Sequence, residues 1–249
     1  MESVISKKGV IASAENLGLR SIPGWIAQSF KLWRLSPFKY TLLSLAPLVA
    51  EGLLQLVPEA GVLLSKVLAP MVAAGILLGV DQLARTGKLS WRCVLAGFLH
   101  KRLGGLVLVA TLTSLAVFAT QISVASWVYG GGRVFDAVVL GHMSAHPGLR
   151  THFFTEVLIV PGVVPATLLA LVIPFFLFED MGVLSSLGQG VRRLLSVWSV
   201  FAAFLVLNAA LFAVALLDGP SVLLLLVVMP WSTLFTYVVY RAMAGKPLR

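Results

Sequence analysis

Six stretches of this sequence are apolar over a length that meets or approaches what is needed to cross a lipid bilayer. A helix needs roughly 20 apolar residues to cross the hydrocarbon, and lipid offers no hydrogen-bond partner to a non-helical backbone. The sequence therefore predicts an all-α integral membrane protein with six transmembrane helices. The predicted spans are about Phe38–Leu56, Val62–Leu83, Leu103–Val128, Phe153–Phe178, Val197–Leu217 and Ser221–Tyr240.

The composition excludes a soluble globular protein. Hydrophobic residues make up 59% of the chain and charged residues 12%, whereas soluble domains carry about 25% charged residues. The net charge of +9 could suggest a nucleic-acid partner. The basic residues flank the apolar stretches instead of forming one continuous stripe, so membrane lipid is the expected partner and nucleic acid is not.

The basic residues also predict how the chain threads the membrane. Of the 19 Lys and Arg residues, Arg133 and Arg150 fall on one side of the six-span arrangement and Lys66 falls within a span. The other sixteen fall on the opposite side, which is expected to be cytoplasmic together with both termini, because cationic loops resist translocation. They are Lys7, Lys8, Arg20, Lys31, Arg34, Lys39, Arg85, Lys88, Arg92, Lys101, Arg102, Arg192, Arg193, Arg241, Lys246 and Arg249.

Each predicted hairpin is preceded by a segment with the period of an amphipathic helix that lies in the membrane surface. The apolar faces are Ile22, Trp25, Ile26, Phe30 and Trp33 in the first segment, Trp91, Val94, Leu95 and Phe98 in the second, and Leu184, Leu187, Val191, Leu194 and Trp198 in the third. From these segments the basic side chains expected at lipid headgroups are Lys31, Arg34, Arg92, Lys101, Arg102, Arg192 and Arg193.

The second span of each hairpin contains a proline that is followed by a glycine near the basic side. The pairs are Pro70 with Gly87, Pro165 with Gly182, and Pro230 with Gly245. The sequence thus predicts one membrane domain over residues 1–249, built from three parallel repeats at about 22–88, 89–182 and 183–246. The alternative is chance similarity among apolar helices that contain proline.

The leading segment contains Gly24-Trp25, Phe30-Lys31-Leu32-Trp33 and Ser36-Pro37, and Phe176–Gly182 precedes the third amphipathic segment. With the repeat pattern, these short motifs resemble a family of uncharacterised six-span bacterial inner-membrane proteins, similar to the YciC-like group. The resemblance implies a location in the bacterial inner membrane. It supplies no catalytic residues and no cofactor.

Glu51 and Lys66 are the strongest candidates for function, because charges inside a membrane span usually face protein or water. Both lie a few residues from the Pro58 turn, so they are expected at similar depth in adjacent antiparallel helices. The pair is interpreted either as an ion or proton site, or as a buried pair that fixes helix register, or as two side chains that reach outward to the interface. Gln121 is a further polar candidate, for which an interhelical hydrogen bond is expected, as for Asn208.

Glu156 is the last intramembrane candidate, at the outer start of the fourth span. It is predicted either to join Glu59 and Asp218 in a polar outer vestibule or to be solvated at the interface. His142 and His146 lie in the predicted outer loop, where a solvated loop is favoured over a metal site because no further ligand pattern accompanies them. Glu179-Asp180 is expected to cap the following helix.

No nucleophile elbow or phosphate-binding loop is present, so no catalytic residue, metal or cofactor is predicted. The leading hypothesis is a non-enzymatic inner-membrane protein that binds lipid or a membrane-protein partner. The alternative is a small transporter or channel that uses Glu51, Lys66, Glu156 and Gln121. A lipid-modifying enzyme ranks third.

Overall fold

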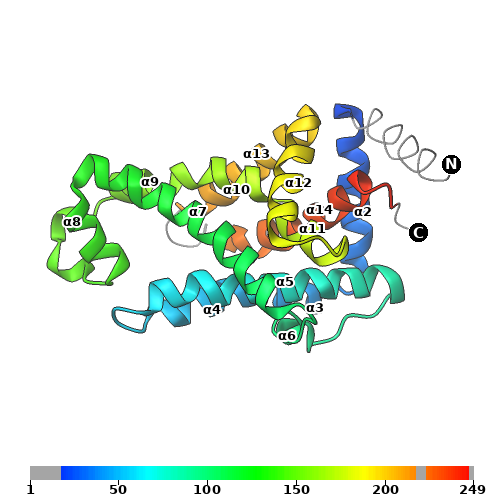
Figure 1. Ribbon diagram of the computed structural model, residues 1–249, viewed down its shortest axis with the longest axis horizontal. Coiled ribbons are helices and arrows are strands. Elements are labelled where there is room, and N and C mark those ends of the chain that lie inside the picture. Colours follow the sequence, from blue (N-terminus) through cyan, green and yellow to red (C-terminus); the bar gives the residue numbers. More distant parts are fainter. Residues whose placement is uncertain (1–17, 217–222, 247–249) are drawn as a thin grey trace.

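The computed structural model describes residues 18–216 and 223–246, and within these residues all regular structure is helical (Figure 1). The all-helical prediction is therefore confirmed. The principal helices are α2 (Ile22–Leu35), α3 (Pro37–Ser44), α4 (Ala46–Gln55), α5 (Gly61–Thr86), α6 (Cys93–Ala96), α7 (Leu103–Tyr129), α8 (Gly131–Val134), α9 (His152–Ile159), α10 (Val163–Leu169), α11 (Val172–Phe178), α12 (Val183–Ser196), α13 (Trp198–Ala215) and α14 (Leu225–Met243).

Three helical segments of the described chain are long and apolar enough to cross a membrane by themselves. They are α5, α7 and the run His152–Phe178, which contains α9, α10 and α11. A fourth candidate is the pair of α12 and α13, which meet at an angle of 103°. The chain is thus a membrane protein with several candidate spans.

Two of the predicted spans are broken. The first divides at Leu45 into α3 and α4, and Pro47 occupies the first turn of α4. The fourth is interrupted by a 3-10 turn at Val160–Gly162, which contains Pro161. Proline lacks a backbone N–H and is tolerated best where a helix begins, so these prolines favour new helices over continuation of the old ones. By contrast, Pro70 and Pro230 lie inside α5 and α14 without interrupting them.

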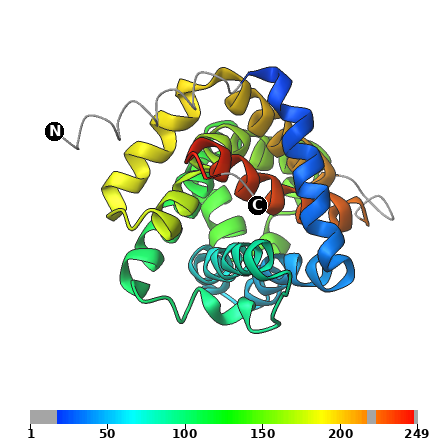
Figure 2. The same cartoon turned by 90° about the vertical axis from the view of Figure 1, so that its right-hand side faces the viewer.

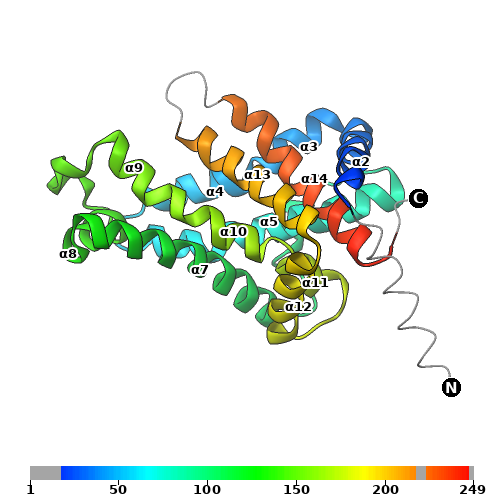
Figure 3. The ribbon, with the colours of Figure 1, turned by 90° about the horizontal axis from the view of Figure 1, so that it is seen from above.

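The molecule is elongated, and the two ends differ. Figures 1 and 3 show α8 at one end, and α2, α12 and the C-terminal ends of α5 and α14 at the other. At that second end, α2 and α12 run across the long axis, as helices in a membrane surface would. The predicted cytoplasmic basic residues in these elements are Lys31, Arg34, Arg85, Arg192, Arg193 and Arg241. Lys7, Lys8 and Arg249, and the expected turn at Asp218-Gly219-Pro220, lie outside the described residues.

Each amphipathic segment packs against a helix that ends one of the predicted repeats. The segment containing α6 packs on α5, α12 packs on α11, and α2 packs on α14. Viewed along the long axis, these three segments surround the end of α14 (Figure 2). The first two contacts join neighbours in sequence, whereas the contact of α2 with α14 joins the first helix to the last. The three amphipathic segments are therefore arranged as a ring around the end of α14.

Small residues allow these contacts to be close. A side chain at Gly75 would meet the backbone oxygen of Cys93, and Gly79 faces the Cys93 side chain. Gly97 in turn lies against the backbone of Met71. In the third segment, Gly190 lies against the backbone of Val172 in α11. Gly75 and Gly79 therefore give α5 a close approach to the second amphipathic segment.

The second amphipathic segment differs from the prediction. Only Cys93–Ala96 is helical there. Cys93 is buried and Val94 and Phe98 pack against the main core, whereas Trp91 is 52% and Leu95 is 56% exposed, so the predicted apolar face is divided between the protein and its surroundings. The glycine contacts place the small Cys93 at the interface with α5 and leave Trp91 and Leu95 on the outside.

The predicted outer loop is folded. It contains α8, the π-helical turn Phe135–Val139 and two 3-10 turns. Val134, Ala137 and Leu149 pack with Ala125 of α7 and Phe154 of α9 in a small separate core. The interior of the segment is therefore apolar, whereas the histidines, for which a solvated loop is predicted, lie toward its surface: His142 is exposed and His146 is half-buried.

Candidate functional site

A cavity of about 490 Å³ lies between the hairpin of α4 and α5 on one side and α7 and the fourth predicted span on the other. Most of its wall is apolar, with Ala69, Val117, Leu169 and Ile173 among its lining residues. The charged side chains in this wall are Glu51 and Lys66. The cavity is therefore amphipathic, with its charges confined to one place.

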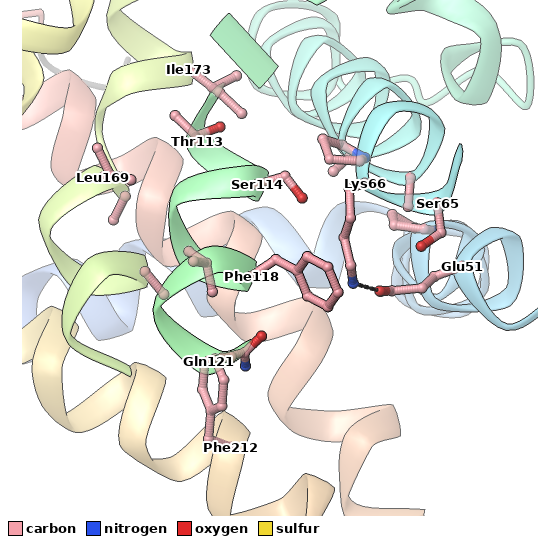
Figure 4. Close-up of a pocket in the computed structure, with 17 residues that line it drawn as sticks. Glu51, Ser65, Lys66, Thr113, Ser114, Phe118, Gln121, Leu169, Ile173 and Phe212 are labelled. Atoms are coloured by element: carbon pink, nitrogen blue, oxygen red, sulfur yellow. Dashed lines mark hydrogen bonds and ion pairs between the residues drawn. The ribbon is translucent and has the colours of Figure 1, made fainter. Parts of the chain in front are cut away.

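Glu51 and Lys66 form an ion pair between α4 and α5 (Figure 4). The two helices are antiparallel neighbours joined by the Pro58 turn, and this arrangement brings the two predicted candidates together. Glu51 also accepts a hydrogen bond of 3.3 Å from Nε2 of Gln55, one turn later in α4. The side chains remain 32% and 16% exposed respectively, so the pair can be reached from outside the protein.

The opposite wall of the cavity is formed by α7, which presents Phe118 and Gln121 toward the pair (Figure 4). The Phe118 ring centroid lies 5.1 Å from Nζ of Lys66, within the range of a cation–π contact. Gln121 donates from Nε2 to the backbone oxygen of Ile159 at 3.3 Å, which confirms the expected interhelical bond. Gly162 allows this side chain to lie against the fourth span, because a Cβ there would be 2.6 Å from Nε2.

A second cavity of about 200 Å³ adjoins the first, since Ala73, Ala166, Ala170 and Ile173 line both. It extends between α5, α13 and α14 and contains Asn208. Nδ2 of Asn208 donates to Oγ1 of Thr167 at 3.2 Å, so the expected interhelical bond forms here too. The two cavities are therefore neighbours that share part of their walls.

Glu156 does not join this site. It pairs with His152 at 3.0 Å on the first turns of α9 and does not line either cavity. Glu59, at the α4–α5 turn, has a positive φ of 62° and donates its backbone N–H to Leu140. Asp218 lies outside the described residues. Glu59 and Glu156 therefore do not come together in the predicted outer vestibule, because each is held in a separate contact.

The predicted headgroup residues have two kinds of environment. Lys31, Arg34, Arg92 and Arg192 are exposed at the basic end, and Arg193 is half-buried. Lys101 is exposed and pairs with Asp180 at 3.2 Å. Arg102 instead acts within the protein: its Nη2 donates to the backbone oxygens of Phe176 and Met181 at 3.0 and 2.6 Å, and its guanidinium stacks on the Phe176 ring.

A cluster of carboxylates and tyrosines lies at the basic ends of α5, α11 and α14. Asp81 accepts hydrogen bonds of 2.8 Å from the Tyr237 hydroxyl and from Nε of Arg85. Glu179 accepts from the Tyr240 hydroxyl at 2.5 Å and from Nζ of Lys246 at 2.8 Å. These bonds link the three helices that end the predicted repeats.

Two sequence interpretations change here. Asp81 lies inside the predicted second span, and the rule that selects Glu51 and Lys66 would also have selected it. Glu179 and Asp180 do not cap α12, whose N-cap is Gly182 without a side-chain bond. Instead Glu179 joins the cluster, and Asp180 takes a positive φ of 51° in the turn. The Lys101 ammonium lowers the pKa of the Asp180 carboxyl through its hydrogen bond and charge.

In the outer segment, Asp136 contacts both histidines, with Oδ1 2.9 Å from Nδ1 of His142 and Oδ2 2.6 Å from Nε2 of His146. These bonds, the one to His142 first, lower the pKa of the Asp136 carboxyl. Within the described residues, no group of three or more His, Cys, Asp or Glu side chains has an arrangement that could hold a metal ion. The contact explains the histidine spacing as a local structural link.

Comparison of this chain with family models, with curated proteins and with solved structures finds no match.

Proposed function

We propose that the protein is a non-enzymatic membrane protein that binds a phospholipid in the first cavity. The observation that carries the proposal is the Glu51–Lys66 ion pair within a cavity that is otherwise mostly apolar. An amphiphile matches this distribution, because its headgroup would meet the charges and its acyl chain the apolar wall. A soluble polar substrate would leave the apolar part of the wall without a partner.

The depth of the pair supports a headgroup as its ligand. Lys66 and Arg85 lie on the same continuous helix, α5, separated by about 28 Å at the rise of an α-helix. The hydrocarbon of a bilayer is about 30 Å thick. If Arg85 marks the cytoplasmic boundary, Lys66 lies near the outer boundary, where phospholipid headgroups begin. A site at this level needs no charge at the centre of the membrane.

The basic end supports a second contact with lipid, through exposed side chains on the amphipathic segments. Lys31 and Arg34 on α2, Arg92 before α6, and Arg192 on α12 are available for anionic headgroups. This arrangement supports a bacterial inner-membrane location with both termini in the cytoplasm, in keeping with the resemblance to the YciC-like group. A membrane-protein partner would reach the same surface.

The proposed architecture has six spans in three repeats at about 22–88, 89–182 and 183–246. In this arrangement the two parts of the first span are α3 and α4, and α13 and α14 are the fifth and sixth. The order of the contacts supports the repeats, because each amphipathic segment packs on the helix that ends the preceding repeat and α2 completes the cycle on α14.

Transport is the second candidate, favoured by the adjoining position of the two cavities. The first contains Glu51 and Lys66, and the second reaches Thr236 on α14, next in sequence to Tyr237 of the cluster with Asp81. A pathway for substrate would need this cluster to open. Flux of a fluorescent phospholipid across proteoliposomes, lost in Glu51→Gln, would favour transport over binding alone.

The binding proposal is tested by filling the cavity. Ala73 lines both cavities, so Ala73→Phe should exclude the acyl chain. We expect the purified variant to retain less phospholipid than the wild type after detergent exchange, as measured by extraction and mass spectrometry. Ala116→Phe is the matched control, because Ala116 is exposed on α7 and lines neither cavity. Equal retention by all three proteins would contradict the proposal.

A further inference from the structure

We infer that the bound phospholipid has a zwitterionic headgroup, whose ammonium binds Glu51 and whose phosphate binds Lys66. The inference rests on the proposed function and adds the chemical class of the ligand. It starts from the pairing of the charges in the cavity wall, in which Glu51 and Lys66 neutralise each other.

Charge conservation separates the possible headgroups. An anionic headgroup that binds Lys66 would displace Glu51 and leave its carboxylate unpaired in a part-buried site, which is unfavourable. An uncharged headgroup could replace neither partner of the pair. A zwitterion replaces both partners at once: its ammonium replaces Lys66 as the partner of Glu51, and its phosphate replaces Glu51 as the partner of Lys66.

The hydrogen-bonding capacity of the wall favours a primary ammonium. The hydroxyls of Ser65 and Thr113 donate to backbone oxygens of their own helices, Val62 at 2.7 Å and Ala110 at 2.9 Å. Both residues line the cavity, and each hydroxyl oxygen keeps the capacity to accept a further hydrogen bond. Gln121 uses Nε2 for Ile159 and retains its amide oxygen as an acceptor. A primary ammonium has three N–H donors, so it can bind the Glu51 carboxylate and still donate to an acceptor of this wall.

The phosphate would use the cation on the same side of the cavity. The contact of Lys66 with the Phe118 ring holds the ammonium group of Lys66 beside the cavity even when Glu51 is displaced. The exposure that both charged side chains retain gives a headgroup access to them. Without lipid, Glu51 and Lys66 thus bind each other, and with lipid each binds one charge of the headgroup.

The test compares two lipids in one membrane. The full-length protein is reconstituted in vesicles of equimolar phosphatidylethanolamine and phosphatidylglycerol, extracted in mild detergent, and the retained lipid is identified by mass spectrometry. We expect phosphatidylethanolamine to be enriched by roughly tenfold, the effect of one favourable hydrogen bond to a charged group. Retention in the vesicle ratio, or enrichment of phosphatidylglycerol, would overturn the inference.

Variants assign the enrichment to the pair. Glu51→Gln and Lys66→Gln should each abolish it. The double variant Glu51→Gln/Lys66→Gln removes both charges together, so it keeps a polar pair without an unpaired charge even if the single variants fold poorly. The enrichment should be absent there too. Glu156→Gln is the control, because this carboxylate lies outside the cavity and its loss should leave the enrichment unchanged.

The outcomes separate this inference from the proposed function. If wild-type protein retains lipid without headgroup preference, and Ala73→Phe loses that lipid, the cavity binds lipid but the headgroup assignment is wrong. If Ala73→Phe and the wild type retain the same lipid, the cavity is not the binding site and both statements fail. Enrichment that persists in the double variant would place the headgroup elsewhere on the protein.

Discussion

Asp81 and Tyr237 show how single residues connect distant parts of this chain. The Tyr237 hydroxyl lies in the interior, where an unpaired polar group is unfavourable, and Asp81 supplies its acceptor across 156 residues of sequence. Arg85 binds the second carboxylate oxygen of Asp81, so the carboxylate is satisfied on both sides. The pair therefore fixes α14 against α5 at the basic end.

Tyr237→Phe should destabilise the protein, because it leaves one oxygen of Asp81 without its main donor. A hydrogen bond to a charged group contributes about 1.5–3 kcal/mol, and about 2–4 °C of melting temperature corresponds to 1 kcal/mol in a chain of this size. We expect thermal unfolding in detergent, followed by fluorescence, to shift down by several degrees. Tyr129→Phe is the control, because its ring packs on Phe154 and its hydroxyl makes no hydrogen bond within the described residues.

An unchanged melting temperature in Tyr237→Phe would show that Arg85 and Arg241 satisfy Asp81 without the tyrosine. A shift of equal size in the Tyr129 control would mean that loss of a hydroxyl is unfavourable at any interior tyrosine of this protein.

At the scale of elements, the packing of one helix on another depends on close contact between their backbones. The segment containing α6 has one helical turn and gains little stability from its own hydrogen bonds. Gly75, Gly79 and Gly97 bring it against α5 closely enough for extensive van der Waals contact. The position of the second amphipathic segment is therefore set by α5, and its own amphipathic pattern has less influence.

Gly75→Ala should disrupt this contact, since the added Cβ would lie 2.4 Å from the backbone oxygen of Cys93. The atoms that this Cβ would meet belong to the backbone, so they cannot move aside without shifting α6. We expect a lower melting temperature and faster hydrogen exchange over residues 89–99, measured by mass spectrometry. Gly52→Ala is the matched control in α4, where the new Cβ meets nothing within 4 Å and helix propensity predicts a gain of about 0.5–1 kcal/mol.

If hydrogen exchange over residues 89–99 is the same in Gly75→Ala and Gly52→Ala, the segment is held on α5 by contacts other than those at Gly75.

At the scale of the whole molecule, the arrangement has a defined polarity. The folded outer segment at α8 and the ring of amphipathic segments lie at opposite ends of the long axis (Figure 1). The basic residues concentrate at the ring, so the proposed topology retains this side in the cytoplasm. The proposed lipid site near Lys66 then lies toward the outer leaflet, and the cluster around Asp81 lies toward the inner one.

Cysteine labelling tests this polarity. In a Cys93→Ser background, Ser144→Cys lies in the exposed outer segment and Ser185→Cys on the exposed surface of α12. A membrane-impermeant maleimide added to intact cells should label Ser144→Cys, and should label Ser185→Cys only after the cytoplasmic membrane is permeabilised. The two variants are matched controls for each other. The reverse pattern would place the basic ring outside and remove the basis of the proposed depth of Lys66.

The sequence by itself determined the helical membrane class, the apolar segments and the similar depth of Glu51 and Lys66 in adjacent helices. These follow from local hydropathy and from a short turn between antiparallel helices, so neighbouring sequence is sufficient. The tertiary structure decided that these two side chains pair, that α2 packs on α14, and that Asp81 meets Tyr237. The last two contacts join residues far apart in the chain, which no local pattern encodes. The cavity likewise depends on how five separate segments pack.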